Sequence, residues 1–370
     1  MKKEKIVLGM SGGVDSSVAA LLLKEKGYDV HAIFMKNWDD KHAICNSEDD
    51  FADASSVCKA LDIKLKKINY TKEYKNRVFN KFIQDHVEGF TPNPDVLCNR
   101  EIKFDVFRNY AKEIGADKIA SGHYARVVKQ NNSYFIKKAK DKNKDQSYFL
   151  YQLDGEIIKN LELPLGEINK DDVRKIAEEN SLATFEKKDS TGICFIGERK
   201  YNDFVGQFFK SKKGKIITVD GENIGIHNGH MYFTVGQRKG LGIGAKNSAF
   251  DKPWYVFKKD IEKNIVYVAQ GSEHPALFSD ELIADNMFWN IDSDKIFQLK
   301  YKAKVRYRDV DHSCKILSLN ENGCYVKFDN KIKAITCGQS IVLYDKNDVC
   351  IGGGIIRKRN VPFLGEEING

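Results

Sequence analysis

The stretch KIVLGMSGGVDSSVAALLLKEKG, residues 5–27, decides the fold of the first half of the chain. It opens with a short β-prone run that ends in a loop of small residues, GMSGGVDSS (9–17). Apolar residues then recur at helical spacing from Val14 to Leu22, and Gly27 follows where a helix would end. The stretch predicts a strand, a tight loop and a helix whose N-terminus faces that loop.

The same alternation of strand and helix continues to about residue 128. Further strands are predicted over 30–36, 63–70 and 118–128, and further helices over 47–61, up to 87 and over 94–114. Alternation of this length predicts a Rossmann-like α/β domain, with a parallel sheet covered by helices on both faces. Such sheets bind ligands at the carboxyl ends of their strands.

The pattern changes near residue 204, where Gly and β-forming residues replace long helices. From about residue 283 the chain consists of short strands separated by turn signals, which is typical of a small antiparallel barrel. We therefore expect three domains, over residues 1–203, 204–282 and 283–370. The second is expected to be small and β-rich, and the third to be the barrel.

The composition is that of an ordinary folded protein, with 42% hydrophobic and 30% charged residues. No apolar run approaches the ~20 residues that a bilayer span needs, and the N-terminus does not resemble a secretory signal. The net charge of +8 is compatible with a polyanionic partner without requiring one. We expect a monomeric cytoplasmic enzyme without membrane contact.

The loop at residues 9–17 is neither of the two common nucleotide loops. No Lys follows its glycines, which excludes a GxxxxGK[ST] P-loop, and its spacing does not fit the dinucleotide motif GxGxxG. It resembles SGGxDSS, the pyrophosphate loop of ATP pyrophosphatases, which cleave ATP between the α- and β-phosphates and transfer AMP to a carbonyl oxygen. The resemblance predicts ATP contacts from Gly9, Met10, Ser11, Gly12, Gly13, Val14, Asp15 and Ser16. The Asp15 carboxylate is suited to hold Mg²⁺.

The stretch TPNPDVLCNR, residues 91–100, forms a stiff approach to a cysteine. Asn93 and Pro94 predict a helix start, with Asn as N-cap and Pro at the first helical position. Cys98 then lies about one turn into the helix, where the amide dipoles are expected to lower the pKa of its thiol. Asp95, on the same face, is a candidate general acid or base, although its charge also suits a helix start.

A series of motifs resembles one family, the bacterial tRNA-specific 2-thiouridylases, which thiolate the wobble uridine. The series is in family order and spans nearly the whole chain: GMSGGVDSS, NPDVLCNREIKFD, SGHYAR, KDQSYFLY, DSTGICFIGERKYNDF, FTVGQRKGLGIG, PWYV, VRYR and CGQSIVLYD. The resemblance implies a catalytic ATP-binding domain of the adenine nucleotide alpha hydrolase type, a central tRNA-binding domain and the barrel.

The resemblance also implies a mechanism that uses two cysteines. ATP adenylates O2 of the uridine, and Cys194 carries a persulfide that it receives from an upstream sulfur-carrier protein. Cys98 frees the sulfur as partner nucleophile, which leaves a Cys98–Cys194 disulfide, and Asp95 acts as general acid/base. An alternative, ranked second, has an iron–sulfur cluster held by Cys98, Cys194 and a third ligand such as Asp95.

The resemblance implies further contacts with the nucleotide and with tRNA. The residues at these positions would also suit purely structural roles. For the nucleotide these are Met35 and Gly122; for tRNA they are Asn93, Pro94 and Asp95 at the target base, and His123, Lys144, Asp145, Gln146, Arg306, Tyr307 and Gln339. On pattern alone, Met35 suits core packing, His123 suits a strand end, and the loop around Lys144 suits a solvated charged surface.

The stretch YKAKVRYR, residues 301–308, gives separate support for a nucleic-acid partner. As a strand throughout, it would place Tyr301, Ala303, Val305 and Tyr307 on one face and Lys302, Lys304, Arg306 and Arg308 on the other. A face of four cations suits a phosphate backbone, and Arg357, Lys358 and Arg359 add further charge.

The remaining cysteines do not form a CxxC pair or a zinc-ribbon spacing. We expect them to be buried small hydrophobic residues: Cys45, Cys58, Cys314, Cys324, Cys337 and Cys350. Two rival functions remain, another pyrophosphate-loop ligase and a tRNA-binding protein without chemistry. A ligase needs no paired cysteines, and a binding protein needs none of Asp15, Cys98 and Cys194.

Overall fold

The computed structural model describes residues 3–38, 47–189, 193, 195–197, 201–243, 252–321 and 323–366. The chain forms two compact units. The first comprises Met1–Asn80, Pro94–Glu198 and Asn347–Ile351, and the second comprises Lys81–Asn93, Arg199–Lys346 and Gly352–Gly370.

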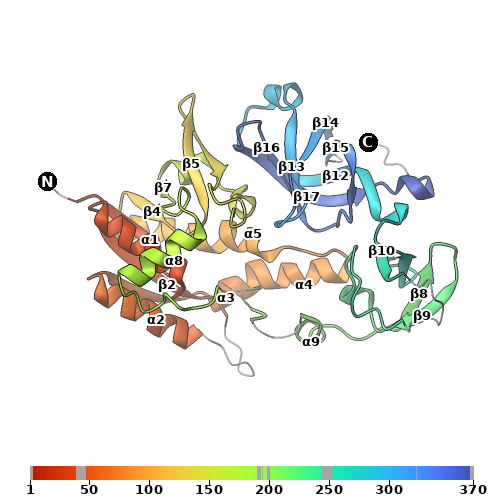
Figure 1. Ribbon diagram of the computed structural model, residues 1–370, viewed down its shortest axis with the longest axis horizontal. Coiled ribbons are helices and arrows are strands. Elements are labelled where there is room, and N and C mark those ends of the chain that lie inside the picture. The colour runs from red at the N-terminus through yellow and green to blue at the C-terminus, as the bar shows by residue number, and fades with distance from the viewer. Residues whose placement is uncertain are drawn as a thin grey trace. The chain divides into compact units, whose positions relative to one another are not determined.

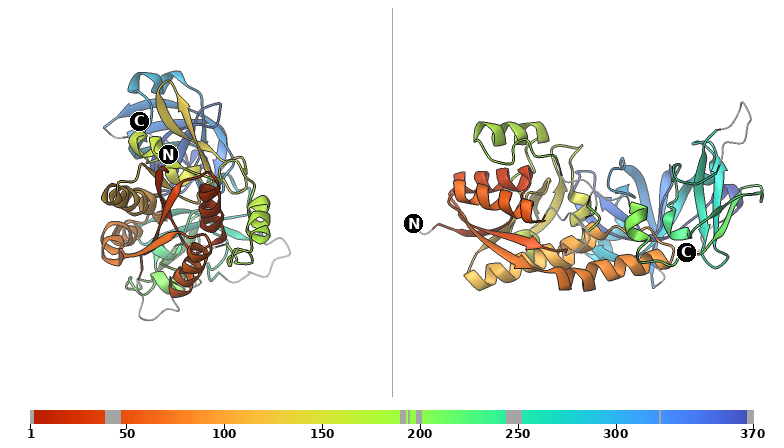
Figure 2. Two further views of the ribbon diagram at one scale, coloured as in Figure 1. Left: turned by 90° about the vertical axis from the view of Figure 1, so that its left-hand side faces the viewer. Right: turned by 90° about the horizontal axis from the view of Figure 1, so that it is seen from below.

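The first unit is built on a five-stranded parallel sheet with strand order β3-β2-β1-β4-β7 (Figure 1). The strands are β1 Lys5–Gly9, β2 Asp29–Lys36, β3 Lys64–Asn69, β4 Lys118–Ala120 and β7 Leu161–Glu162. Helices cover both faces, with α1 Val14–Glu25, α2 Ser47–Ala60 and α8 Lys170–Glu179 on one face and α6 Phe104–Ile114 on the other (Figure 2). The predicted α/β architecture is confirmed.

The strand order reverses at β1, which lies between β2 and β4. In open α/β sheets, ligands bind at this switch point, outside the carboxyl ends of the strands. The loops that follow β1 and β4 flank this crevice, so the topology brings residues 10–13 next to residues 121–124. The buried core beneath these loops includes Ile6, Leu8 and Val18.

The strand predicted over 118–128 is interrupted, and this prediction was wrong in detail. β4 ends at Ala120, and the chain turns at residues 121–124 before β5 Ala125–Gln130 pairs with β6 Ser133–Lys138 as an antiparallel hairpin. Its two-residue turn places Asn131 and Asn132 at φ 47° and 66°, a conformation that Asn tolerates better than most residues.

The helix predicted over 94–114 is present, but it contains a π-helical segment. α5 Pro94–Cys98 continues into π-helical Asn99–Lys103 and then into α6, and Gly115 ends the helix at φ 62°. A second π segment, Lys75–Phe79, lies between α3 Thr71–Tyr74 and α4 Asn80–Val87. π-Helical turns occur frequently at functional sites.

The second unit contains a four-stranded sheet and a closed barrel. The sheet has the order β10-β11-β8-β9, formed by Trp254–Asp260, Ile265–Gln270, Gly214–Thr218 and Asn223–His227. The barrel has the order β12-β15-β14-β13-β16-β17, formed by Phe278–Trp289, Gly323–Lys333, His312–Asn320, Tyr301–Lys304, Ser340–Tyr344 and Cys350–Arg359. The predicted antiparallel barrel is confirmed, while the three domain borders remain a prediction.

The strand predicted over 301–308 extends only to Lys304, so the face of four cations does not form. Tyr301, Ala303 and Val305 are buried as expected. Lys304, which was predicted to be exposed, is also buried, with 9% of its surface accessible. The chain bends after Lys304, and only Arg306 and Arg308 of the four predicted cations are exposed.

Candidate active site

The loop after β1 is held in shape by its own small side chains. The Ser11 backbone N–H donates to Ser16 Oγ at 3.2 Å, and the Gly13 N–H donates to Ser11 Oγ at 3.4 Å. The hydroxyls of Ser16 and Ser17 both donate to the Gly13 carbonyl oxygen at 3.0 Å. These bonds fix the loop before any ligand arrives, which is what preorganised phosphate binding requires.

Two features keep the loop open to an anion and close to its neighbours. Gly13 is the N-cap of α1, and no side chain caps the helix there, so backbone N–H groups of the first turn are available to a ligand. Gly12 has φ +77°, and a Cβ at this position would lie 2.1 Å from the backbone oxygen of Asp50. A side chain at residue 12 would therefore push the loop away from α2.

The loop after β4 packs directly against the start of α1. A Cβ at Gly122 would lie 3.0 Å from the Asp15 carbonyl carbon and 3.0 Å from the Ser16 nitrogen. Met35 lies near the end of β2, opposite Ile68 of β3, and is partly buried. These placements bring Gly122 to the nucleotide loop, while contact of Gly122 and Met35 with a nucleotide remains a prediction.

The Asp15 carboxylate belongs to an ion-pair network that the sequence did not predict. Its Oδ1 accepts hydrogen bonds from the Tyr124 hydroxyl at 2.7 Å and from Lys170 Nζ at 2.6 Å. Lys170 Nζ also lies 2.7 Å from Asp189 Oδ1. Lys170 therefore connects the nucleotide loop to the residue that lies five positions before Cys194.

Asp189 gathers two further cations besides Lys170. Lys144 Nζ donates to Asp189 Oδ2 at 2.6 Å, and Arg174 Nη2 donates to Oδ1 at 2.8 Å. Burial acts to raise the pKa of Asp189, but the hydrogen bonds and charges of Lys144 and Lys170 outweigh it and lower the pKa to about 2. Asp189 is therefore an anion at any physiological pH.

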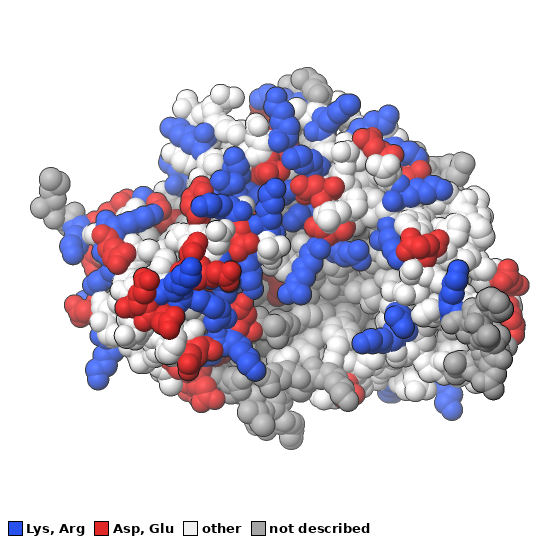
Figure 3. Space-filling model, in the orientation of Figure 1, with Lys and Arg blue, Asp and Glu red and all other residues white. Residues whose placement is uncertain are grey.

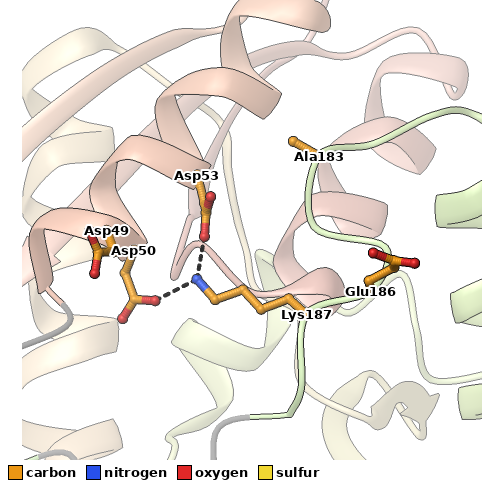
Figure 4. A pocket seen from close by; sticks show the side chains of 6 residues that line it. All are labelled: Asp49, Asp50, Asp53, Ala183, Glu186 and Lys187. Atoms are coloured by element: carbon orange, nitrogen blue, oxygen red, sulfur yellow. Dashed lines mark hydrogen bonds and ion pairs between the residues drawn. The ribbon is translucent and has the colours of Figure 1, made fainter.

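Lys187 makes a second set of ion pairs in the same segment (Figure 4). Its Nζ lies 2.7 Å from Asp50 Oδ1 and also pairs with Asp53, both on α2. These residues line a pocket together with Asp49, Ala183 and Glu186. Lys187 and Asp189 therefore hold residues 187–189 to α2 and α8. This segment lies close to the nucleotide loop, because the backbone of Asp50 also approaches Gly12.

The position of Cys98 corrects the prediction about its pKa. Its side chain is only 4% exposed. Burial raises the pKa of the Cys98 thiol to about 11, Lys103 opposes this rise, and the Asp95 charge adds to it. The expected lowering by helix dipoles is overturned because loss of solvation outweighs the dipoles. Burial likewise raises the pKa of Asp95.

Cys194 lies outside the described residues, but its neighbour Phe195 is described and buried. The Phe195 ring packs against Trp38, Phe79 and Tyr74, with ring centroids 5.6, 5.2 and 6.1 Å apart. Tyr74 is also one of the groups that lower the pKa of the Cys98 thiol. The aromatic cluster formed by Trp38, Tyr74, Phe79 and Phe195 therefore places Phe195 in the neighbourhood of Cys98.

Three predicted tRNA contacts in the loop at 144–146 have partners within the first unit. The Asp145 carboxylate is 4% exposed and accepts hydrogen bonds from the Ala139 and Ser147 backbone N–H groups. Gln146 Oε1 accepts from the Tyr124 N–H at 2.9 Å. Asp145 and Gln146 thus support the loop next to Tyr124, and Lys144 holds Asp189.

His123 is also engaged inside the first unit. Its Nδ1 lies 2.8 Å from Ser121 Oγ, and its ring stacks on Phe104. Burial, with a smaller effect of Lys103, lowers the pKa of His123 to about 3, so the ring is neutral at neutral pH.

In the second unit, Gln339 lies next to the approach to Asn93. Its Nε2 donates to the Thr91 carbonyl oxygen at 2.7 Å, and the Thr91 N–H donates to the Cys337 carbonyl oxygen at 2.9 Å. Arg306 is exposed and lies 3.9 Å from Asp309. Tyr307 is partly buried. Pairing with tRNA remains a prediction for all of these residues.

The cations of IIRKRN do not form an exposed cluster. Arg357 Nε donates to Asp285 Oδ2 at 2.6 Å, and its guanidinium lies 4.8 Å from the centre of the Phe90 ring. Arg359 donates to Ser279 Oγ and to the Phe257 carbonyl oxygen. Lys358 is the exposed member of the three.

On the face shown in Figure 3, cations and anions alternate over α1, α2 and α8.

The predicted burial of the other cysteines is confirmed for Cys58, Cys314, Cys324 and Cys350. Cys337 is partly exposed, which the prediction missed, and Cys45 lies outside the described residues. Within the described part of the chain, no group of three or more His, Cys, Asp or Glu side chains is placed to hold a metal ion. No helix in that part is long and apolar enough to cross a membrane.

Three family models match the chain in sequence order. They are described as tRNA methyl transferase HUP domain, tRNA methyl transferase PRC-barrel domain and aminomethyltransferase beta-barrel domain, over residues 4–198, 202–270 and 279–356. A solved structure, the U34-tRNA thiolase NcsA from Methanococcus maripaludis with its 4Fe-4S cluster, is similar over 55% of this chain and 63% of that one. Its sequence identity is 20% and its TM-score is 0.35, which decides nothing about chemistry.

The curated relatives cover nearly the whole chain and carry one name, tRNA-specific 2-thiouridylase MnmA. The protein of Buchnera aphidicola subsp. Schizaphis graminum is 49% identical over 366 residues, which cover 98% of this chain and 99% of that protein. The protein of Francisella philomiragia is 50% identical over 359 residues, which cover 96% and 100%. The resemblance inferred from the motifs is confirmed, and the chain belongs to the tRNA-specific 2-thiouridylase family.

Proposed function

We propose that the protein is an ATP-dependent tRNA-uridine 2-sulfurtransferase that replaces the C2 oxygen of the wobble uridine with sulfur. The observation that carries the proposal is the placement of Cys98 near the aromatic cluster that anchors Phe195, the residue next to Cys194. Both lie in the unit that contains the nucleotide loop. Relatives about half identical over nearly the full length bear the name of this activity.

The first step activates the base. The uridine O2 attacks the α-phosphorus of ATP, the bond to the β-phosphate oxygen breaks, and pyrophosphate leaves. The N–H groups at the start of α1 and the hydroxyls of the loop are suited to bind the pyrophosphate. Asp15, which is 35% exposed, is suited to hold Mg²⁺, which would neutralise charge on the phosphates.

The second step delivers sulfur. The terminal sulfur of a Cys194 persulfide attacks C2, and AMP leaves with the former O2. The Cys98 thiolate then attacks the Cys194 sulfur, which breaks the S–S bond, leaves 2-thiouridine and forms a Cys98–Cys194 disulfide. A thiol reductant resets the disulfide, and a sulfur-carrier protein reloads Cys194.

The protonation of Cys98 sets a requirement for this second step. Its thiol, with a pKa of about 11, carries a proton at neutral pH and must lose it before attack. Asp95 lies three residues earlier, and its pKa is raised by burial, which makes its carboxylate a better proton acceptor than an exposed one. We assign Asp95 the role of general base toward Cys98.

The target base is assigned to Asn93, Pro94 and Asp95, which lead into Cys98. Further tRNA contacts are assigned to His123, Lys144, Arg306, Tyr307 and Gln339. Asp145 and Gln146 support the same surface from within, since both bind backbone groups. The proposal includes a monomeric cytoplasmic enzyme that uses ATP and Mg²⁺.

The test is anaerobic thiolation of unmodified tRNA with ATP and inorganic polysulfide, whose sulfane sulfur can load the Cys194 thiol as a persulfide by exchange. The as-purified protein is compared with Cys98→Ser and Cys194→Ser, and iron is assayed in every sample. Thiouridine from iron-free protein, lost in both variants, is the expected result. Activity that follows iron content would instead assign both cysteines to a cluster.

The modified nucleoside is identified by mass spectrometry, because the family models carry methyl transferase names. The proposal predicts the mass change of an oxygen-to-sulfur exchange. The mass change of an added methyl group, or an unmodified tRNA under every condition, would overturn it.

A further inference from the structure

Lys170 is a buried cation whose partners belong to two different parts of the first unit. Its side chain is 8% exposed, and its Nζ lies between Asp15 on α1 and Asp189. Burying an ammonium group costs free energy unless it is paired and hydrogen-bonded. Its two carboxylate partners compensate for this cost and allow Lys170 to keep its charge.

Lys170 is itself held in place from several sides. Asp189 fixes Nζ, and Asp189 is in turn held by Lys144 and Arg174. The Lys170 backbone N–H donates to Asp141 Oδ2 at 3.0 Å. The ammonium therefore has a defined position before a nucleotide binds.

The two donors on Asp15 converge on one oxygen. Lys170 Nζ and the Tyr124 hydroxyl both bind Oδ1, at 2.6 and 2.7 Å. Oδ2 accepts no hydrogen bond from the residues that the structure describes, and the carboxylate is 35% exposed. Partners that bind one oxygen of a carboxylate orient the other toward a metal ion.

We propose that Lys170 is a positioning residue of the nucleotide site, which together with Tyr124 fixes Oδ1 of Asp15 and presents Oδ2 to the magnesium ion bound with ATP. The inference rests on the proposed function for the identity of the nucleotide. A purely structural reading, in which Lys170 only joins α1 to α8, predicts a loss of stability without a change in magnesium dependence.

The test measures binding of a non-hydrolysable ATP analogue by isothermal titration calorimetry, with Mg²⁺ and with EDTA. For Lys170→Met we expect affinity in Mg²⁺ to fall by about 10- to 100-fold, as for other residues that orient a metal ligand. Affinity in EDTA should stay unchanged. Tyr124→Phe, which removes only a hydroxyl, should give a smaller loss of the same kind and keeps the test valid if Lys170→Met does not fold.

Lys175→Met is the matched control, because Lys175 is an exposed cation on the same helix, α8, and binds neither Asp15 nor Asp189. It should bind the analogue as wild type does in both buffers. Unchanged magnesium affinity in both Lys170→Met and Tyr124→Phe would overturn the inference, and so would equal losses with and without Mg²⁺. Failure of the wild-type protein to bind the analogue would instead count against the proposed function.

Discussion

Gly122 and Asp15 approach each other so closely that a Cβ at position 122 would lie 3.0 Å from the Asp15 carbonyl carbon. The two residues are more than 100 positions apart in sequence. Asp15 lies in the first turn of α1, and Gly122 lies in the loop after β4 at the switch point of the sheet. The contact means that the SGHY turn shapes the nucleotide loop from outside.

A larger residue at 122 should therefore displace the start of α1. We expect Gly122→Val to raise the KM for ATP and to slow AMP formation, by as much as about 100-fold in rate if the loop moves by 1 Å. Gly155→Ala is the control, because a Cβ there meets no atom within 4 Å. The KM values are measured from steady-state AMP formation at several ATP concentrations. Equal KM values in wild type and Gly122→Val would show that this contact does not shape the nucleotide site.

The buried Cys98 thiol should react slowly with alkylating agents. With a pKa of about 11, its alkylation rate should keep rising with pH up to that value, whereas a free cysteine levels off near about 8.5. Iodoacetamide labelling of a Cys194→Ser variant, followed by mass spectrometry of the Cys98 peptide, gives the rate. A plateau near pH 8 would show that the free enzyme already holds a thiolate.

Asp95→Asn tests the charge that acts on this thiol. Asp95 raises the pKa of Cys98, so removal of its charge should speed alkylation at fixed pH. The same variant should slow thiolation if Asp95 is the general base, typically by about 10²- to 10⁴-fold. Faster labelling together with slower turnover separates the electrostatic effect from the catalytic role, and unchanged turnover would contradict the general-base assignment.

Buried histidines in the second unit, among them His86 and His230, should make its stability sensitive to acid. Burial lowers the pKa values of His86 and His230 to about 4 from 6.5. His86 Nδ1 lies 2.8 Å from the Phe82 carbonyl oxygen, and Nε2 bonds to the Tyr201 hydroxyl, so both ring nitrogens have partners.

Between pH 6.5 and 4 the unfolded chain binds protons that the folded chain does not. The contribution of these histidines to stability should be constant above pH 6.5 and fall below it, by up to about 1.4 kcal/mol per pH unit for each histidine. Urea unfolding across this range measures the slope, and His86→Asn should flatten it whatever its effect on stability at pH 7. A wild-type protein equally stable at pH 7 and 4.5 would contradict the assignment.

The parts of the site that follow from short-range pattern were predictable. Strand and helix periods, and the small residues at 9–17, reflect local geometry, so the loop and its place after β1 could be inferred. The pKa of Cys98 could not, because helix position argues for a thiolate, while the burial that raises the pKa depends on tertiary packing that short-range pattern does not show.

The network around Asp15 was missed because its members are scattered along the sequence. Lys170 and Tyr124 lie 155 and 109 positions from Asp15, and no short motif joins them. One physical signal appears once the helix is known: a lysine at the first position of α8, after the N-cap Asn169, is disfavoured by the helix dipole, which favours a carboxylate partner for Lys170. Phe195 carried no such signal, since an aromatic residue beside a cysteine usually only packs.

The bend after Lys304 gives a final prediction about tRNA binding. Arg306 and Arg308 are exposed, whereas Lys304 is buried in the barrel. Replacing both arginines with Ala should weaken tRNA binding and reduce the salt slope, by about 0.7 to 0.9 for each phosphate contact that is lost. Lys304→Ala should instead lower the thermal midpoint and leave the salt slope unchanged, because its charge does not face solvent. Filter binding at several salt concentrations measures both slopes, and an unchanged slope in the double arginine variant would remove this part of the barrel from the tRNA interface.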